Sequence, residues 1–247
     1  MIRRKNMRLD QFLVHEGHCD SRARAQSLIA AGLVTVNGVV IMKASKIVGD
    51  GDAVAVTGAV HDFVSRGGMK LDAALKAFAI NPDGKICLDL GVSTGGFTDV
   101  LLRHGAGKVY AVDVGRDQLH QKIAGDPRVV NLEQTHAKDL TRALVPEPVD
   151  LIVCDVSFIS LKKALPFALA LAAPGAQLAA LVKPQFEVGP EGVGKGGLVK
   201  EGLAEPVAQD ISRWLESEGW SIIGLIDSPI LGGDGNREFL IGASKTA

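Results

Sequence analysis

The chain has 247 residues, 47% of them hydrophobic and 22% charged, which suits one large domain with a small second one and excludes a disordered protein. Its formal net charge of −1 gives by itself no reason to expect a polyanionic partner. The three cysteines, Cys19, Cys87 and Cys154, are too widely spaced for a disulfide framework or a zinc site, so we expect a cytoplasmic protein with no bound metal.

The charge is unevenly distributed along the chain. Residues 1–50 contain eight Lys or Arg against four Asp or Glu, a balance of +4, while the remaining residues carry −5. A basic N-terminal segment on an acidic body favours contact of that segment with phosphate. A solvated charged face would give the same composition.

The N-terminal segment has the pattern of a small α+β unit. Apolar spacing predicts a helix within residues 8–17 and a second one within 20–32, with Asp20 or Ser21 as its N-cap. The Asn37-Gly38 pair between two short β-branched runs is a strong signal for a hairpin, and a further short strand follows it.

After a linker expected at residues 58–66, short β-branched runs alternate with helical stretches. This alternation predicts an α/β domain with a doubly wound, mainly parallel sheet. The expected strands are 86–90, 108–112, 128–132, 151–154, 177–182, 221–226 and 238–242.

No segment has the pattern of a membrane anchor. The N-terminus lacks the apolar core of a signal peptide. The longest apolar stretch, residues 164–182, is interrupted by Pro166, Pro174 and Gly175, so it is not expected to form a spanning helix of about 20 residues. We therefore expect no stable membrane association.

Residues 86–115 combine an apolar strand, a glycine-rich turn, an amphipathic stretch and a second apolar strand that leads to Asp113. In an open α/β sheet, ligands bind beyond the carboxyl ends of the strands. The dinucleotide pattern GxGxxG and the phosphate-binding pattern GxxxxGK[ST] are both absent. Asp89 would repel a pyrophosphate but suits the cationic amine of a methionine moiety, and Asp113 suits ribose hydroxyls. We therefore predict S-adenosylmethionine as the cofactor, against the alternative of a purely structural turn.

Several strings along the chain resemble one family. SRGGMKL, DLGVSTGGFTD, YAVDVG, CDVSFISL, LVKPQFE and GNREFL occur here in the order found in the TlyA family, also called hemolysin A, within the FtsJ-like 2′-O-ribose methyltransferases. The resemblance implies a Rossmann-like methyltransferase domain at residues 67–247. It also implies methylation of ribosomal RNA, with cytidine in the small- or large-subunit RNA as the expected target.

Residues 7–57 resemble the RNA-binding domain named after the fourth protein of the small ribosomal subunit. The resemblance rests on the strings SR at 21–22, LI at 28–29 and VNG at 36–38. Such domains place a basic helix face on structured RNA and read mostly shape and phosphate. The implied RNA-contacting residues are Arg8, Arg22, Arg24, Lys43 and Lys46.

The FtsJ-like resemblance also implies a catalytic tetrad of Lys70, Asp155, Lys183 and Glu238. In this reading Lys183 accepts the proton of the 2′-hydroxyl, and the ammonium of Lys70 eases that proton's transfer and polarises the hydroxyl. Asp155 and Glu238 would orient the two lysines. Taken singly, each residue also suits an ordinary role, such as an ion pair between Glu238 and Arg237.

The implied cofactor-binding residues lie in the glycine-rich turn and at the ends of three strands: Asp89, Gly91, Ser93, Thr94, Gly95, Gly96, Phe97, Asp113 and His136. Phe97 suits the core equally well, and His136 stands where relatives tend to have Asn or Asp. Residues 187–201 are expected to form a mobile loop near Lys183 that closes over RNA, or else a surface excursion.

Three other functions stay open at this point. Methylation of a base would favour an Asp/Asn-Pro-Pro-aromatic string or a Pro-Cys pair, whereas the chain reads DVSF at 155–158 and neither Cys87 nor Cys154 follows a proline. A membrane-acting cytolysin would suit the family's older name but lacks a spanning segment. A non-catalytic ribosome-binding factor would not need the tetrad.

Overall fold

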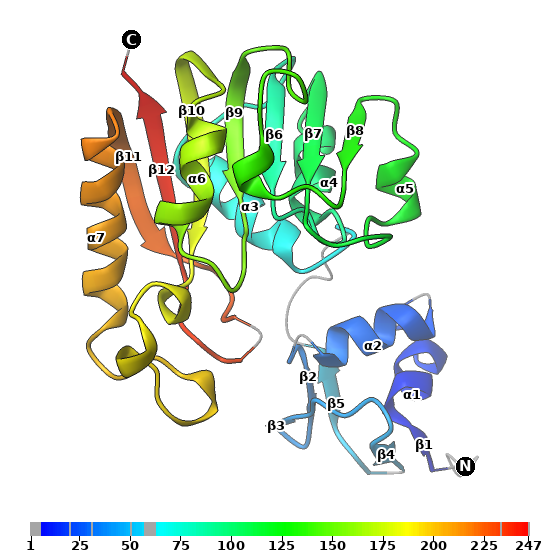
Figure 1. Cartoon of the computed structure of the whole chain (residues 1–247). Coiled ribbons are helices and arrows are strands. Elements are labelled where there is room, and N and C mark those ends of the chain that lie inside the picture. Colours follow the sequence, from blue (N-terminus) through cyan, green and yellow to red (C-terminus); the bar gives the residue numbers. More distant parts are fainter. Residues whose placement is uncertain are drawn as a thin grey trace. The chain divides into compact units, whose positions relative to one another are not determined.

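The computed structural model describes residues 6–19, 21–30, 32–49, 51–56, 63–232 and 234–246. The chain divides into two compact units between residues 62 and 63 (Figure 1). Most of the expected linker at 58–66, the basic residues Arg3, Arg4 and Lys5, and the N-cap alternative Asp20 lie outside the described residues.

The N-terminal unit contains two helices and five short strands. Their order is β1 (Met7–Arg8), α1 (Leu9–His15), α2 (Arg22–Ala30), β2 (Val34–Val36), β3 (Val39–Val40), β4 (Ile47–Val48) and β5 (Val54–Val56). Strands β2 and β3 form the predicted hairpin, with positive φ angles of 53° at Asn37 and 79° at Gly38, and β5 pairs with the other edge of β2. The pairing of β1 with β4 was not predicted, because two-residue strands leave no periodicity to read.

The start of α2 shows why that helix forms where it does. The hydroxyl of Ser21 accepts a hydrogen bond from the backbone N–H of Arg24 at 3.2 Å, which satisfies a donor of the first helical turn. Apolar faces of both helices then pack on β2, with Leu9, Leu13, Leu28 and Ile29 fully or almost fully buried.

The C-terminal unit is a seven-stranded sheet in the order β11-β12-β10-β9-β6-β7-β8. Its strands are β6 (Ile86–Leu90), β7 (Lys108–Val112), β8 (Val129–Leu132), β9 (Val149–Cys154), β10 (Ala172–Val182), β11 (Trp220–Asp227) and β12 (Phe239–Lys245). Only β12 runs against its neighbours, so the prediction of a mainly parallel sheet is confirmed.

Several predicted strand boundaries need correction, including the start of β9 at Val149 rather than 151 and the end of β12 at Lys245 rather than 242. Strand β10 starts at Ala172 rather than 177, because the Pro174-Gly175 pair forms an irregularity inside the strand and does not end it. Glu238 lies just before β12, not within it. Residues 164–182 form the end of one helix followed by this strand, in agreement with the prediction that they do not make a spanning helix.

Helices cover both faces of the sheet (Figure 1). One face packs against α3 (Gly67–Ala77), α4 (Gly96–Arg103) and the short α5 (Gln121–Ala124), and the other packs against α6 (Leu161–Leu169) and α7 (Ala204–Ser217). Along β9, Leu151 and Val153 join the first layer and Ile152 and Cys154 the second. This two-sided burial explains why the central strands read as continuous apolar runs.

The segment after β10 is more structured than the sequence suggested. It contains three 3₁₀ turns, η2 (Pro184–Phe186), η3 (Pro190–Gly192) and η4 (Lys195–Gly197), and an antiparallel bridge between Val193 and Val199. The side chain of Asn236 holds this segment in place: it accepts a hydrogen bond from the N–H of Val199 and donates one to the carbonyl of Gly197, both at 2.9 Å. Residues 187–201 are thus anchored beside the chain that leads to Glu238.

Among the residues described, none of the helices combines the length and the apolar character needed to span a bilayer.

Candidate active site

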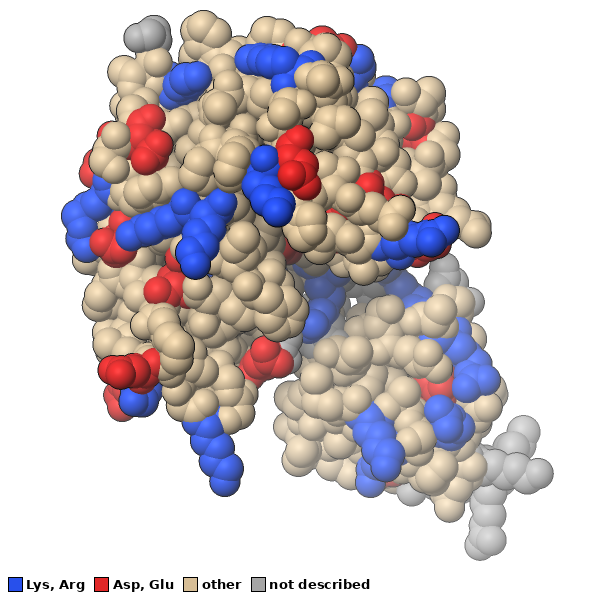
Figure 2. Space-filling model, in the orientation of Figure 1, with Lys and Arg blue, Asp and Glu red and all other residues tan. Residues whose placement is uncertain are grey.

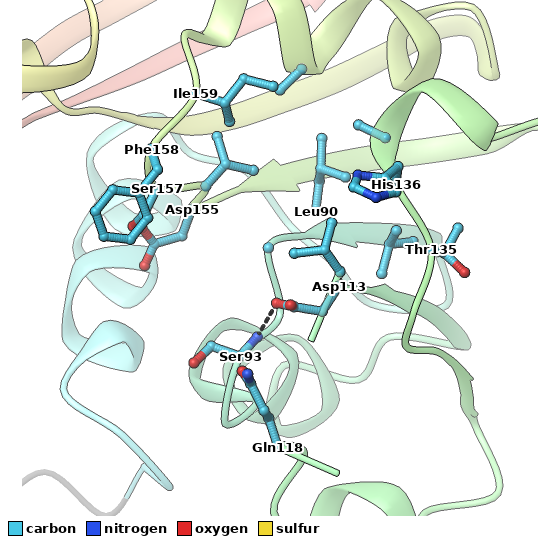
Figure 3. Close-up of a pocket in the computed structure, with 16 residues that line it drawn as sticks. Leu90, Ser93, Asp113, Gln118, Thr135, His136, Asp155, Ser157, Phe158 and Ile159 are labelled. Carbon is cyan, nitrogen blue, oxygen red and sulfur yellow. Dashed lines mark hydrogen bonds between the residues drawn. The ribbon is translucent and has the colours of Figure 1, made fainter. Parts of the chain in front are cut away.

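A pocket of about 360 Å³ opens at the carboxyl ends of β6, β7, β8 and β9 (Figure 3). Its walls come from the glycine-rich turn, from the loops after β7 and β8, and from the loop that connects β9 to α6. The lining residues are Leu90, Gly91, Ser93, Val112, Asp113, Val114, Gln118, Thr135, His136, Ala137, Asp155, Val156, Ser157, Phe158, Ile159 and Ala164. This volume lies in the range of small-molecule sites.

Gly91 lets two strand ends approach closely. Its φ is 87°, and a Cβ at this position would lie 2.8 Å from the carbonyl oxygen of Asp155. The N–H of Asp155 in turn donates to the carbonyl of Leu90 at 2.9 Å. Any side chain at residue 91 would therefore push the glycine-rich turn away from Asp155.

Asp113 organises the turn from the next strand. Its two carboxylate oxygens accept hydrogen bonds from the backbone N–H groups of Ser93 and Gly115, each at 2.7 Å, and the first of these bonds is drawn in Figure 3. Ser93 adopts a positive φ of 47° to make its bond. Each oxygen retains a further lone pair on the pocket side for a hydroxyl donor.

Thr135 and His136 lie in the loop that follows β8 and line the same pocket (Figure 3). The sequence singled out only His136. Thr135 could have been found by the same rule, since it follows the third parallel strand at the ligand-binding edge.

Asp89 is placed differently from the other acids. Its side chain is fully buried and lines neither this pocket nor the second one described below. The Thr98 hydroxyl donates to one of its oxygens at 2.6 Å, and the other oxygen, Oδ1, has no hydrogen-bond partner. Burial raises the pKa of Asp89 to about 7, with a smaller contribution from the charge of Asp155. Direct contact between Asp89 and a cofactor amine stays a prediction.

The raised pKa of Asp89 predicts a distinct pH dependence of stability. Because the folded state binds this proton more tightly than the unfolded state, the contribution of Asp89 to stability falls as the pH rises from about 4 to about 7 and is constant above that range. The free energy of unfolding of Asp89→Asn, relative to the wild type, should therefore increase over this range by at most about 4 kcal/mol. Urea unfolding at several pH values measures this difference, and parallel curves for the two proteins would contradict it.

Three further residues of the turn, Gly95, Gly96 and Phe97, lie away from the pocket walls. Phe97 is 4% exposed and belongs to the core layer of α3 and α4. Gly95, with a φ of 93°, caps α4, and a Cβ on Gly96 would lie 2.1 Å from the Ser65 hydroxyl. None of these three residues lines either of the two pockets.

A second, smaller pocket of about 230 Å³ shares Ser93 with the first. It is lined by Ser65, Arg66, Gly67, Lys70, Ser93, Thr94, Ile230 and Leu231. The glycine-rich turn therefore separates two adjacent cavities, one bordered by Asp155 and the other by Lys70.

The four predicted catalytic residues form two ion pairs. Lys70 Nζ lies 2.6 Å from Glu238 Oε2, and the two side chains are 11% and 3% exposed. Lys183 Nζ lies 2.7 Å from Asp155 Oδ1 and also donates to the Ser157 hydroxyl at 2.7 Å. Four residues distant in the sequence thus meet at the carboxyl edge of the sheet.

The first turn of α3 brings the two ion pairs to the same site. A Cβ on Gly67 would lie 3.7 Å from Asp155 Oδ2, so the helix that carries Lys70 begins against the carboxylate that holds Lys183. Two cations and two anions at the boundary of two adjacent cavities form an arrangement that can hold a hydroxyl group and remove its proton.

The loop after β9 contains two residues that the sequence did not single out. Ser157 bonds Lys183, and Phe158 stands at the pocket with 91% of its surface exposed and a positive φ of 65°. A bulky side chain in this backbone region is strained, and such strain is often found at functional sites. Both residues could have been singled out from the sequence, because they follow Asp155 in the loop at the carboxyl end of a predicted strand.

The predicted RNA-contacting residues lie on the N-terminal unit, which shows more basic than acidic side chains on the face seen in Figure 2. Arg8 and Arg22 both reach Asp10 at 2.9 Å, and Gln26 donates to the same carboxylate at 3.1 Å. Asp10 is fully buried, and these donors hold its pKa well below the usual range, with Arg8 the largest cause. The carboxylate therefore fixes two arginines side by side.

Three further basic residues of this unit were predicted to contact RNA. Lys43 and Lys46 are exposed, and Arg24 is half-buried in the first turn of α2. No group of three or more His, Cys, Asp or Glu side chains able to hold a metal ion occurs in the described part of the chain.

Comparison with known families matches both units. Residues 63–245 match the family described as FtsJ-like methyltransferase, and residues 7–54 match the S4 domain.

Comparison with curated proteins and solved structures gives matches along nearly the whole chain. The chain is 44% identical over 239 residues to a Mycobacterium tuberculosis protein described as 16S/23S rRNA (cytidine-2′-O)-methyltransferase TlyA, covering 96% of this chain and 89% of that one. It is 41% identical to Hemolysin A of Brachyspira hyodysenteriae, covering 95% and 98%. A solved structure of a hemolysin candidate from Streptococcus thermophilus is 39% identical, with a TM-score of 0.76 and coverage of 100% and 90%.

Proposed function

The chain belongs to the TlyA family of FtsJ-like methyltransferases, and from this premise we propose that it transfers the methyl group of S-adenosylmethionine to the 2′-hydroxyl of a cytidine in ribosomal RNA. The observation that carries the proposal is the pairing of Lys70 with Glu238 and of Lys183 with Asp155 beside the pocket. A hydroxyl acceptor needs a base, and this site offers one. A cytoplasmic location follows from the proposed substrate.

The pocket fits the cofactor through its own residues. Asp113 keeps lone pairs free for ribose hydroxyls, and Val114, Ala137 and Ile159 offer apolar surface to an adenine ring. The unpartnered Oδ1 of Asp89, behind the turn, suits a nearby cationic amine. When bound, S-adenosylmethionine supplies the electrophilic methyl group.

Each tetrad residue then has a defined task. Lys183, in its neutral form, accepts the proton of the 2′-hydroxyl, and Asp155 and Ser157 hold its amine in place. Lys70 donates a hydrogen bond to the reacting oxygen and stabilises the negative charge that develops there. Glu238 orients Lys70 through their buried ion pair.

The exposed Phe158 supports an RNA acceptor over a small molecule. Single-stranded or extruded bases commonly stack on aromatic rings, and this exposed ring lines the pocket directly after Ser157, the residue that bonds the proposed base. A nucleotide stacked on Phe158 would place its ribose toward Asp155 and Lys183.

Replacing Asp113 by alanine should weaken cofactor binding by about tenfold or more, because a hydrogen bond to a charged group contributes about 1.5–3 kcal/mol. Calorimetric titration measures the affinity, with Asp117→Ala, an acid whose side chain is 84% exposed in the same loop, as the control. The loss should largely disappear for an analogue that lacks both ribose hydroxyls. Equal losses for both ligands would mean that Asp113 acts only by holding the turn.

RNA affinity should come largely from the N-terminal unit. Arg22→Ala and Arg24→Ala should each weaken binding to ribosomal RNA and lower the slope of log affinity against log salt by about one unit, as expected for one lost phosphate contact. Filter binding at four or more salt concentrations measures the slope, with Lys76→Ala in the C-terminal unit as the control. Slopes equal to the wild type in both variants would show that this face does not meet phosphate.

The direct test of the proposed reaction uses purified protein, ribosomal subunits and cofactor with a labelled methyl group. A methylated 2′-oxygen blocks alkaline cleavage of the adjacent phosphodiester, so the label should be recovered in an alkali-resistant dinucleotide. Label in mononucleotides would instead indicate base methylation, and no transfer to either subunit would refute the proposed reaction.

A further inference from the structure

Glu187 lies four residues after Lys183, at the end of the short turn η2. The backbone N–H of Phe186 donates to the carbonyl of Lys183 at 2.9 Å, and that of Glu187 donates to the carbonyl of Pro184 at 3.0 Å. These two bonds close the segment from Lys183 to Glu187 into one short turn, so the position of Glu187 is coupled to that of the Lys183 backbone.

The Glu187 carboxylate binds the first turn of α6. The Ser160 hydroxyl donates to it at 2.6 Å and the backbone N–H of Leu161 donates at 2.7 Å. Ser160 is also the N-cap of α6, where its hydroxyl accepts from the N–H of Lys162. Glu187 therefore attaches the Lys183 segment to the helix that begins directly after the Asp155–Ile159 loop.

Three further contacts join the same two segments. Lys183 reaches Asp155 and Ser157, each at 2.7 Å, and the Phe158 and Phe186 rings lie 5.1 Å apart. The loop after β9 and the turn after β10 are thus held together at both ends, by Lys183 on the pocket side and by Glu187 on the α6 side.

The Glu187 carboxylate is half-buried, and the fold does not favour its charge. Burial raises its pKa, and the bonds from Ser160 and Leu161 offset this only in part. A half-buried acid whose charge the fold disfavours, next to a proposed catalytic site, suggests a functional reason for its presence.

We propose that Glu187 is a positioning residue that holds Lys183 and the Ser157–Phe158 loop in register by binding the N-terminus of α6. The expected effect of Glu187 on the reaction rate rests on the proposed methyl transfer, whereas its expected effect on the position of Lys183 does not. Glu187 touches neither pocket, so its effect on the reaction passes through the geometry of Lys183.

The structural consequence is tested by the reactivity of the Lys183 amine toward acetic anhydride, read residue by residue by mass spectrometry. The Lys183 side chain is 11% exposed and pinned by two partners, whereas Lys76, with 70% exposure, serves as an internal reference. In Glu187→Ala, the acetylation rate of Lys183 should rise at least threefold while that of Lys76 stays constant. Glu191→Ala, an exposed acid in the same segment, is the matched control and should change neither rate.

The catalytic consequence is tested by single-turnover methylation. Glu187→Ala should lower the rate at least tenfold with cofactor affinity within twofold of the wild type, and Glu187→Gln, which keeps one acceptor for the Leu161 N–H, should recover part of the rate. Labelling and rate equal to those of Glu191→Ala would overturn the proposal. So would parallel increases at Lys183 and Lys76 together with a lower unfolding temperature, since these would indicate general loss of structure.

If the wild type methylates no RNA, the proposed function fails, and the labelling experiment still decides the role of Glu187.

Discussion

Replacing Lys183 by alanine should lower the single-turnover rate of methyl transfer by roughly 10²–10⁴-fold, the usual contribution of a general base. Cofactor affinity should stay nearly unchanged, because the proposed partner of the amine is the acceptor hydroxyl, and Asp155 and Ser157 rather than the turn hold the amine. Rapid-quench assays with saturating cofactor isolate this step, and Lys163→Ala, an exposed lysine on α6, is the control.

Lys183→Arg separates two roles of the same residue. A guanidinium keeps the positive charge but does not accept a proton at neutral pH, so this variant should be almost as inactive as alanine. A near-normal rate would mean that Lys183 supplies only charge. Proton removal would then fall to water or to Asp155, and the tetrad would act as an electrostatic clamp.

The second large effect concerns the ion pair of Lys70 and Glu238. Glu238→Ala should abolish activity and also lower the free energy of unfolding by about 3 kcal/mol, because it leaves the largely buried ammonium of Lys70 without a partner. The double variant Lys70→Ala/Glu238→Ala should be more stable than Glu238→Ala, since it removes the unpaired charge. Urea unfolding of both proteins measures the difference.

The surface pair of Glu205 and Arg237 provides the control for this prediction. Both side chains are about half exposed, so Glu205→Ala should change stability far less than Glu238→Ala. Equal stability of Glu238→Ala and Glu205→Ala would contradict this prediction. It would mean that water entering through the second pocket solvates the ammonium of Lys70, so that losing Glu238 does not leave a buried charge unpaired.

The sequence predicted the sheet well because its central strands are buried on both faces. Residues 86–90 and 108–112 are short apolar runs bounded by glycines and acids, a pattern that favours buried strands. The structure has these two strands with the same bounds. Strand β10 was harder, because Pro174-Gly175 normally marks a turn and here sits within a strand. Local signals of this kind are overridden by pairing with neighbouring strands.

The tetrad could be named from the sequence only through resemblance to a family, because its members lie up to 168 residues apart. That Lys70 pairs with Glu238 and Lys183 with Asp155 depends on the spatial order of the strands, which no local pattern gives. For the same reason, the contacts of Ser157 with Lys183 and of Glu187 with Ser160 and Leu161 were not predicted. Each contact joins two segments that are adjacent only after the sheet has formed.

Asp89 and Phe97 were both predicted from the sequence to contact the cofactor, and the structure adds their surroundings. Both belong to the glycine-rich motif, yet one is fully buried against Thr98 and the other packs in the core. A motif includes residues that support the turn as well as residues that touch a ligand, and contact of these two with the cofactor stays a prediction. Distinguishing support from contact required the position of each side chain relative to the pocket.

The most direct measurement is nucleoside mass spectrometry of ribosomal RNA from cells with the gene, without it, and with only the Lys183→Ala variant. The proposed function predicts that 2′-O-methylcytidine at a specific rRNA position disappears without the gene, returns with the wild-type protein and stays absent with the variant. An unchanged set of 2′-O-methylated nucleotides in the three strains would contradict it, and restoration by Lys183→Ala would contradict the assigned base.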